Sequence, residues 1–99
     1  MSDVSSEEWQ EMMLSLVQAM LGAVSCNFRM VSISHDDTWV FSFFLERESP
    51  EDREEIDDIL CEVEALQESE IEYRVNVFVG EGYIPWPKLP ERVIYKRKE

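Results

Sequence analysis

The chain has 99 residues, of which 44% are hydrophobic and 11% aromatic, and its 22 acidic and 9 basic residues give a formal net charge of −13. This length predicts one domain spanning residues 1–99, and this aromatic content excludes an intrinsically disordered chain. A negative field repels nucleic acid and anionic membranes, so we expect neither as a direct partner. We expect a basic partner instead. The alternative is that the charge serves only to keep the protein soluble.

The first predicted element is an amphipathic helix that begins after Ser5. Ser5 and Glu8 form a capping box, in which each side chain accepts a hydrogen bond from a free backbone N–H of the first turn. Gly22 is a residue type that commonly ends helices. We expect the apolar stripe of this helix to pack into the core, with a methionine-rich peptide-binding groove as the alternative. The stripe consists of Trp9, Met12, Met13, Leu16, Val17, Met20 and Leu21.

The apolar run over residues 12–24 has the length of a signal-peptide core, but acidic residues precede it where a signal peptide has basic ones. The run is also too short to span a bilayer. Cys26 and Cys61 have neither zinc-site spacing nor the pattern of a disulfide scaffold, and Cys61 is expected on the buried face of a later helix. We therefore expect the protein to stay in the reducing cytoplasm.

Two strands and a turn are predicted next. Residues 28–34 alternate, with Val31 and Ile33 on one side, and residues 39–45 alternate with aromatic residues on one face. Between them, Asp36 and Asp37 supply turn chemistry, because Asp side chains bond to nearby backbone amides. The two strands should pair as a hairpin.

A second helix is predicted to begin after Ser49, because Ser49 can cap it and Pro50 suits its first position. Ile56, Ile59, Leu60, Val63 and Leu66 are its expected buried stripe. Its opposite surface is acidic, with Arg53 as the one basic residue. A half-buried strand over residues 71–79, an extended proline-rich segment over 83–90 and a short last strand over 93–95 complete the chain.

The predicted fold class is α+β, with two layers: an antiparallel sheet of three to four strands and two helices on one of its faces, in the order α-β-β-α-β-(β). The other sheet face would carry Val40, Phe44 and Phe78. Either the proline-rich segment with Trp86 covers these residues, or they form an apolar patch suited to association. A homodimer through this face or through an exposed strand stays open at this point.

No residue pattern indicates catalysis or a cofactor. His35 lies in a predicted turn beside two aspartates, where a solvated turn is favoured over a catalytic dyad. The sequence has no nucleophile motif, glycine-rich phosphate loop, zinc-ligand spacing or calcium loop. We therefore predict no enzyme, no cofactor and no metal site.

Over residues 20–99, several short runs follow one another in a recognisable order and spacing. They are Leu21-Gly22, Asn27-Phe28-Arg29-Met30-Val31, Phe43-Phe44-Leu45-Glu46, Pro50 to Glu55, Glu62-Val63-Glu64-Ala65, Ile84-Pro85 and Val93-Ile94-Tyr95-Lys96-Arg97-Lys98-Glu99. Together they resemble the small acidic bacterial immunity proteins of polymorphic-toxin and contact-dependent growth-inhibition systems.

This resemblance implies a protein that binds the C-terminal domain of a cognate toxin in the cytoplasm and blocks its active site or substrate groove. Many such toxins are nucleases with basic grooves, which an acidic surface can occupy. The expected partner-binding residues are Glu51, Glu54, Glu55, Asp58 and Glu62 on the second helix, Asp36 and Asp37 in the turn, and Tyr83 and Trp86 as anchors. The alternative function is an acidic adaptor or nucleic-acid mimic that binds a basic host protein and has no dedicated toxin.

Overall fold

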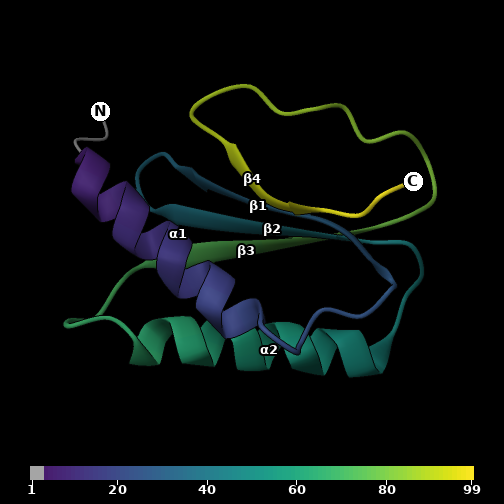
Figure 1. Ribbon diagram of the computed structural model, residues 1–99, viewed down its shortest axis with the longest axis horizontal. Helices are drawn as coiled ribbons and strands as arrows, with labels where there is room; N and C mark the ends of the chain where they lie inside the picture. The colour runs from purple at the N-terminus through teal and green to yellow at the C-terminus, as the bar shows by residue number, and fades with distance from the viewer. Residues whose placement is uncertain (1–3) are drawn as a thin grey trace.

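A computed structural model describes residues 4–99 as a four-stranded sheet with two helices on one face (Figure 1). The elements are α1 (Ser6–Met20), β1 (Phe28–His35), β2 (Trp39–Leu45), α2 (Pro50–Ala65), β3 (Tyr73–Val79) and β4 (Arg92–Lys96). The α+β class, the order of elements and the placement of both helices on one face are confirmed. The optional last strand is present as β4.

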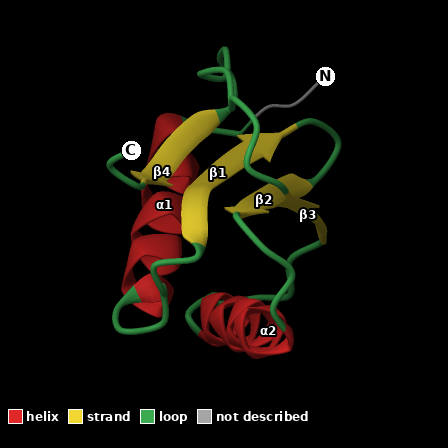
Figure 2. Ribbon diagram, turned by 90° about the vertical axis from the view of Figure 1, so that its right-hand side faces the viewer, coloured by secondary structure: helices red, strands yellow, loops and turns green. Residues whose placement is uncertain are grey.

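The strands lie in the order β3-β2-β1-β4 (Figure 2). The predicted hairpin is confirmed, because β1 pairs antiparallel with β2, and β4 pairs antiparallel with β1. β3 pairs parallel with β2, so the sheet is mixed, and the expectation of an antiparallel sheet was wrong at this pair. The reason is α2, which carries the chain back to the end where β2 began and so makes a crossover connection.

α1 begins with the predicted capping box: Ser5 accepts from the Glu8 amide, and Glu8 accepts from the Ser5 amide. Its buried residues are Trp9, Met12, Leu16, Ala19 and Met20. Val17 and Leu21, predicted in the same stripe, are 43% and 75% exposed. That prediction was wrong for these two residues, because α1 lies at the β4 edge of the sheet. Within residues 4–99, other elements pack against only one side of this helix, and Val17 and Leu21 lie off that side.

α2 begins as predicted, with Ser49 as its cap and Pro50 in the first turn. Ile56, Ile59, Leu60 and Val63 are buried beneath the sheet. Cys61 is exposed, so its expected place in the core was wrong. One residue along a helix is a rotation of roughly 100°, which carries Cys61 off the face that Leu60 and Val63 occupy.

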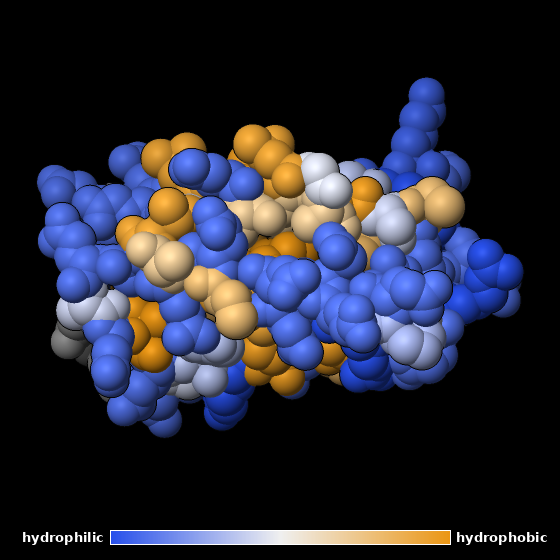
Figure 3. All heavy atoms as spheres, turned by 90° about the horizontal axis from the view of Figure 1, so that it is seen from below, coloured by the Kyte–Doolittle hydropathy of each residue, from blue (hydrophilic) through white to orange (hydrophobic). Residues whose placement is uncertain are grey.

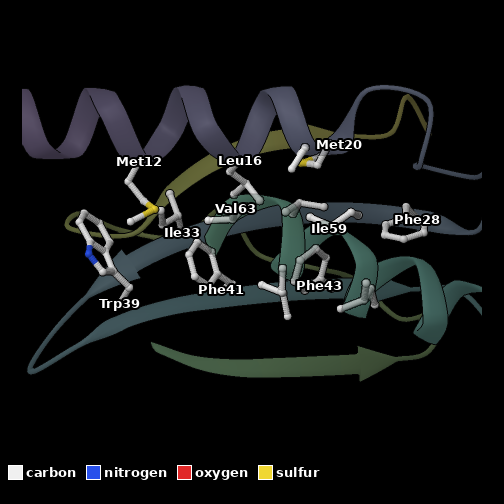
Figure 4. Close-up of a cluster of buried hydrophobic side chains, with 14 of the residues drawn as sticks. Met12, Leu16, Met20, Phe28, Ile33, Trp39, Phe41, Phe43, Ile59 and Val63 are labelled. Carbon is white, nitrogen blue, oxygen red and sulfur yellow. The ribbon is translucent and has the colours of Figure 1, made fainter. Parts of the chain in front are cut away.

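The core fills the space between the sheet and both helices (Figure 4). Phe41 and Phe43 of β2 point toward Leu16 of α1 and toward Ile59 and Val63 of α2. At one end, the Trp9 and Trp39 rings meet edge to face at 5.1 Å between centroids. Burial of this one continuous cluster fixes the two helices against the sheet.

The other sheet face is half covered. The segment from Gly80 to Glu91 crosses the β1 side, where Met30 and Ser32 are fully buried and Ser32 donates to Glu91 at 2.5 Å. On the β2–β3 side Phe44 stacks on Phe78, with ring centroids 4.7 Å apart, and Phe78 remains 48% exposed. Tyr83, Ile84 and Pro85 line a groove beside these rings, and Trp86 is itself 66% exposed. The sequence left two possibilities for this face, cover by the proline-rich segment or an exposed apolar patch. The β2–β3 half of the face is an apolar patch.

Candidate functional site

The outer side of α2 is a row of carboxylates in water. Glu51, Glu54, Asp58 and Glu62 are exposed, and Glu55 is half-buried at the side. Figure 3 looks onto this side of the molecule, where hydrophilic residues make up most of the surface. Arg53 does not neutralise the row, because it pairs with Glu48 at 2.6 Å and the ion pair lowers the pKa of that carboxyl. All five residues expected on this helix therefore lie on one uncompensated surface, which we call the α2 acidic surface.

Asp52 belongs to the same helix but is buried, with 6% of its surface exposed. Its carboxylate accepts from the Ser25 hydroxyl at 2.9 Å and from the Asn27 side-chain amide at 2.8 Å. The same Asn27 amide donates to the Arg47 carbonyl oxygen, and the Arg47 amide donates back to the Asn27 side-chain oxygen. Asp52 thus ties the start of α2 to the segment that leads into β1. The sequence did not predict this structural role, because Asp52 stands in a run of acidic residues that are otherwise on the surface.

Replacing Asp52 by alanine should lower the free energy of unfolding by about 1–3 kcal/mol, because two partly buried donors, the Ser25 hydroxyl and the Asn27 amide, lose this acceptor. Glu51→Ala is the matched control, since Glu51 is the exposed neighbour and its loss should change stability by less than about 0.5 kcal/mol. Urea denaturation of both variants measures the difference. Equal midpoints for the two variants would contradict the role assigned to Asp52.

The turn acids lie between β1 and β2, at the end of the sheet to which α2 returns. Asp36 pairs with Arg74 of β3 at 3.1 Å. A hydrogen bond from the Asp37 amide and then this arginine lower the pKa of the Asp36 carboxyl. Asp37 is exposed. Asp36 is therefore already compensated within the molecule, and Asp37 is the turn carboxylate that a partner would meet.

Tyr83 and Trp86 lie on the other side of the sheet from α2. Tyr83 is 89% exposed. It belongs to the segment between β3 and β4, whose path can be followed in Figure 1. A groove of about 200 Å³ runs beside it, with Phe44, Phe78 and Pro85 among its lining residues. The structure thus separates the two expected aromatic anchors from the α2 acidic surface by the thickness of the sheet. One flat partner surface cannot contact both.

Arg29 anchors the segment that carries Tyr83, and its role was not predicted. Its guanidinium is buried and donates to the carbonyl oxygens of Gly80 and Gly82 at 2.9 and 2.8 Å. It also donates to both carboxylate oxygens of Glu99 at 2.8 and 3.0 Å. These bonds, together with one from Arg97 and the charge of Lys96, lower the pKa of Glu99 to about 2. The sequence signal was a charged residue at the start of an otherwise buried strand, which requires partners when the strand is covered.

The described residues offer no metal cage: residues 4–99 contain no cluster of three or more His, Cys, Asp or Glu side chains that could hold an ion. His35 packs edge-on against Trp39, with ring centroids 4.7 Å apart. Within the same residues no helix is long and apolar enough to cross a bilayer. Among the described residues, the outer side of α2 is acidic, and Tyr83 and Trp86 are exposed aromatic residues.

Residues 9–99 match the model of a protein family described as the MafI2 immunity protein. The chain belongs to the MafI2 immunity protein family. No curated protein matches it at the significance required. The match includes α1 from Trp9 onward, whereas the resemblance began only at residue 20.

Membership of the MafI2 family establishes the coarse function. The protein neutralises a cognate toxin by binding it, and it is not an enzyme. This outcome favours the immunity function over the acidic adaptor without a dedicated toxin.

Proposed function

We propose that this immunity protein neutralises a basic nuclease domain by placing the α2 acidic surface in the groove where the nuclease binds nucleic acid. The observation that carries the proposal is the uncompensated row of carboxylates along one side of α2. A nuclease groove is basic because it binds phosphates, so it would attract this row at long range and hold it at short range. The toxin would be the C-terminal domain of a larger protein, delivered by contact-dependent growth inhibition and blocked in the cytoplasm.

The dimensions of α2 suit this role. A helix of 16 residues is about 24 Å long. Residues three and four positions apart on it have Cβ atoms about 5–6 Å apart, so Glu51, Glu54, Glu55, Asp58 and Glu62 form a ladder of anions along one side. The core fixes α2 through four buried apolar residues, so the ladder is held rigid before it meets its partner. A preorganised surface loses less entropy on binding than a flexible acidic tail.

Tyr83 and Trp86 have a separate role in this proposal, as aromatic anchors for the toxin. Because they lie across the sheet from α2, they can anchor only a different part of the toxin from the groove that receives the helix. Large aromatic side chains on an anchored segment are typical of residues that dominate binding energy. If they rather than α2 carry the affinity, the toxin is blocked at a site away from its groove.

The test is a binding and cleavage assay with the toxin C-terminal domain encoded beside this gene. We expect one-to-one binding, loss of nucleic-acid cleavage at equimolar immunity protein, and an association rate that falls at least tenfold between about 50 and 500 mM salt. A toxin domain that cleaves no nucleic acid would refute the nuclease assignment. An association rate indifferent to salt would refute the electrostatic contact while leaving toxin neutralisation intact.

A further inference from the structure

α1 carries a second apolar stripe that the core does not use. Leu14, Val17 and Leu21 are 68%, 43% and 75% exposed. Their spacing of three and four residues is that of the contact positions in paired helices. Single exposed apolar residues are ordinary on protein surfaces, but three at this spacing form a continuous edge along one side of the helix.

A groove lies beside this stripe. It occupies about 410 Å³ between α1 and β4, and its lining includes Met13, Val93 and Ile94. β4 is a border strand of the sheet, so this groove is at the rim of the molecule, where another chain can reach it (Figure 2). The surface thus offers both projecting leucines and an apolar hollow to receive side chains of that size.

The charge of this surface identifies its occupant. Residues 12–28 contain no Asp, Glu, Lys, Arg or His, in a chain of which 31% of the residues are charged. The cations that flank the groove are engaged: the Arg92 guanidinium lies 4.2 Å over the Trp9 ring, and Lys96 pairs with Glu99 at 3.8 Å. Glu11 is the carboxylate nearest the stripe, one turn before Leu14, so a basic toxin would find much weaker attraction here than on the α2 acidic surface. A second copy, which also carries −13, would meet like-charge repulsion on acidic surfaces and least of it on this one.

We propose that two copies of this chain associate through α1 about a two-fold axis, with Leu14, Val17 and Leu21 of each copy facing the α1–β4 groove of the other. A two-fold interface requires one surface that is complementary to itself. This surface satisfies that requirement because it holds both the projecting side chains and the hollow. The dimer leaves both α2 acidic surfaces free, because α2 packs under the β2–β3 half of the sheet, against Val75 and Val77 of β3.

Sedimentation velocity of the purified full chain, at concentrations from about 1 µM to about 500 µM, tests the proposal without any toxin. We expect the mass to rise toward that of two chains. We also expect at least a threefold tighter dimer at about 300 mM than at about 20 mM NaCl, because salt screens the repulsion between two acidic chains. Toxin binding through the α2 acidic surface should respond to salt in the opposite direction, which distinguishes the two contacts.

The variant Leu14→Glu with Leu21→Glu should remain monomeric over the whole range. Both side chains are mostly exposed, so the fold should tolerate the change, and an unchanged circular dichroism melt will verify this. The matched control is Tyr83→Glu with Leu89→Glu, which adds the same charge at exposed apolar positions outside the stripe and should still dimerise. A wild-type chain that stays monomeric at the highest concentration, or an α1 variant that dimerises like the control, would overturn the proposal.

Discussion

The triple charge reversal Glu54→Lys, Glu55→Lys and Asp58→Lys is expected to weaken toxin binding by about 2–4 kcal/mol, or roughly 30- to 1000-fold. Each lysine replaces attraction to a basic groove by repulsion. The melting temperature should not fall, because Glu54 and Asp58 are exposed and the new lysines lie among other acids of the same helix. Titration calorimetry against the toxin domain measures the loss, and a thermal melt measures the stability.

The matched control is Glu68→Lys, Glu70→Lys and Glu72→Lys, three exposed acids in the segment between α2 and β3. This control changes the net charge by the same amount, so the long-range attraction between the two proteins falls equally. The contact between the α2 acidic surface and the groove of the toxin is kept. We expect it to slow association with little effect on dissociation. If both triple variants lose the same affinity, net charge rather than the α2 acidic surface governs binding.

Arg29→Met is expected to lower the free energy of unfolding by about 2–4 kcal/mol, because it removes four hydrogen bonds. The carbonyl oxygens of Gly80 and Gly82 lose this donor, and the Glu99 carboxylate keeps only its contacts with Arg97 and Lys96. Methionine fills a similar volume, so the loss reports the hydrogen bonds rather than a cavity. Arg29→Lys keeps the charge but not the planar fork and should lose about half as much. Guanidinium denaturation measures both variants, and losses below about 0.5 kcal/mol would show that the guanidinium anchors nothing.

The Arg29–Glu99 pair also makes the free energy of unfolding depend on pH. The pKa of Glu99 is about 2 in the folded chain, against an ordinary value of 4.5. Because the folded pKa is the lower one, the pair contributes its full stability above pH 4.5, and that contribution is lost as the pH falls from 4.5 toward 2. The stability of wild type should therefore decline more steeply over this interval than that of Arg29→Met. Parallel curves would contradict the link between Glu99 and Arg29.

Local sequence signals predicted the elements of this fold well. The capping box at Ser5, the Ser49-Pro50 start of α2 and the alternation along β2 each act within a few residues, and the structure contains each of them where the sequence placed it. The acidic side of α2 followed from the same reasoning, because helical period alone decides which residues share a face. The resemblance over residues 20–99 led to the family for the same reason, since it rested on short runs in order.

Contacts between distant residues could not be predicted in this way. Burial of Asp52 depends on Ser25 and Asn27, and the anchor at Arg29 depends on Glu99, 70 residues away. No local pattern distinguishes Asp52 from its solvated neighbours. The charge at the start of a buried strand indicates that Arg29 needs a partner but does not indicate which residue supplies it. The exposure of Leu14 and Leu21 likewise depends on where α1 ends up against the sheet, which the helical period does not specify.

The sequence by itself therefore determined which segments are helix and strand, the acidity of α2 and the membership of an immunity family, because capping, periodicity and composition act locally. The tertiary structure decided the parallel pairing of β3 with β2, the separation of Tyr83 and Trp86 from the acidic helix, and the free apolar edge of α1. The physical reason is that each of these depends on how the elements share one core, and a residue's exposure is set by the neighbours that this packing brings to it.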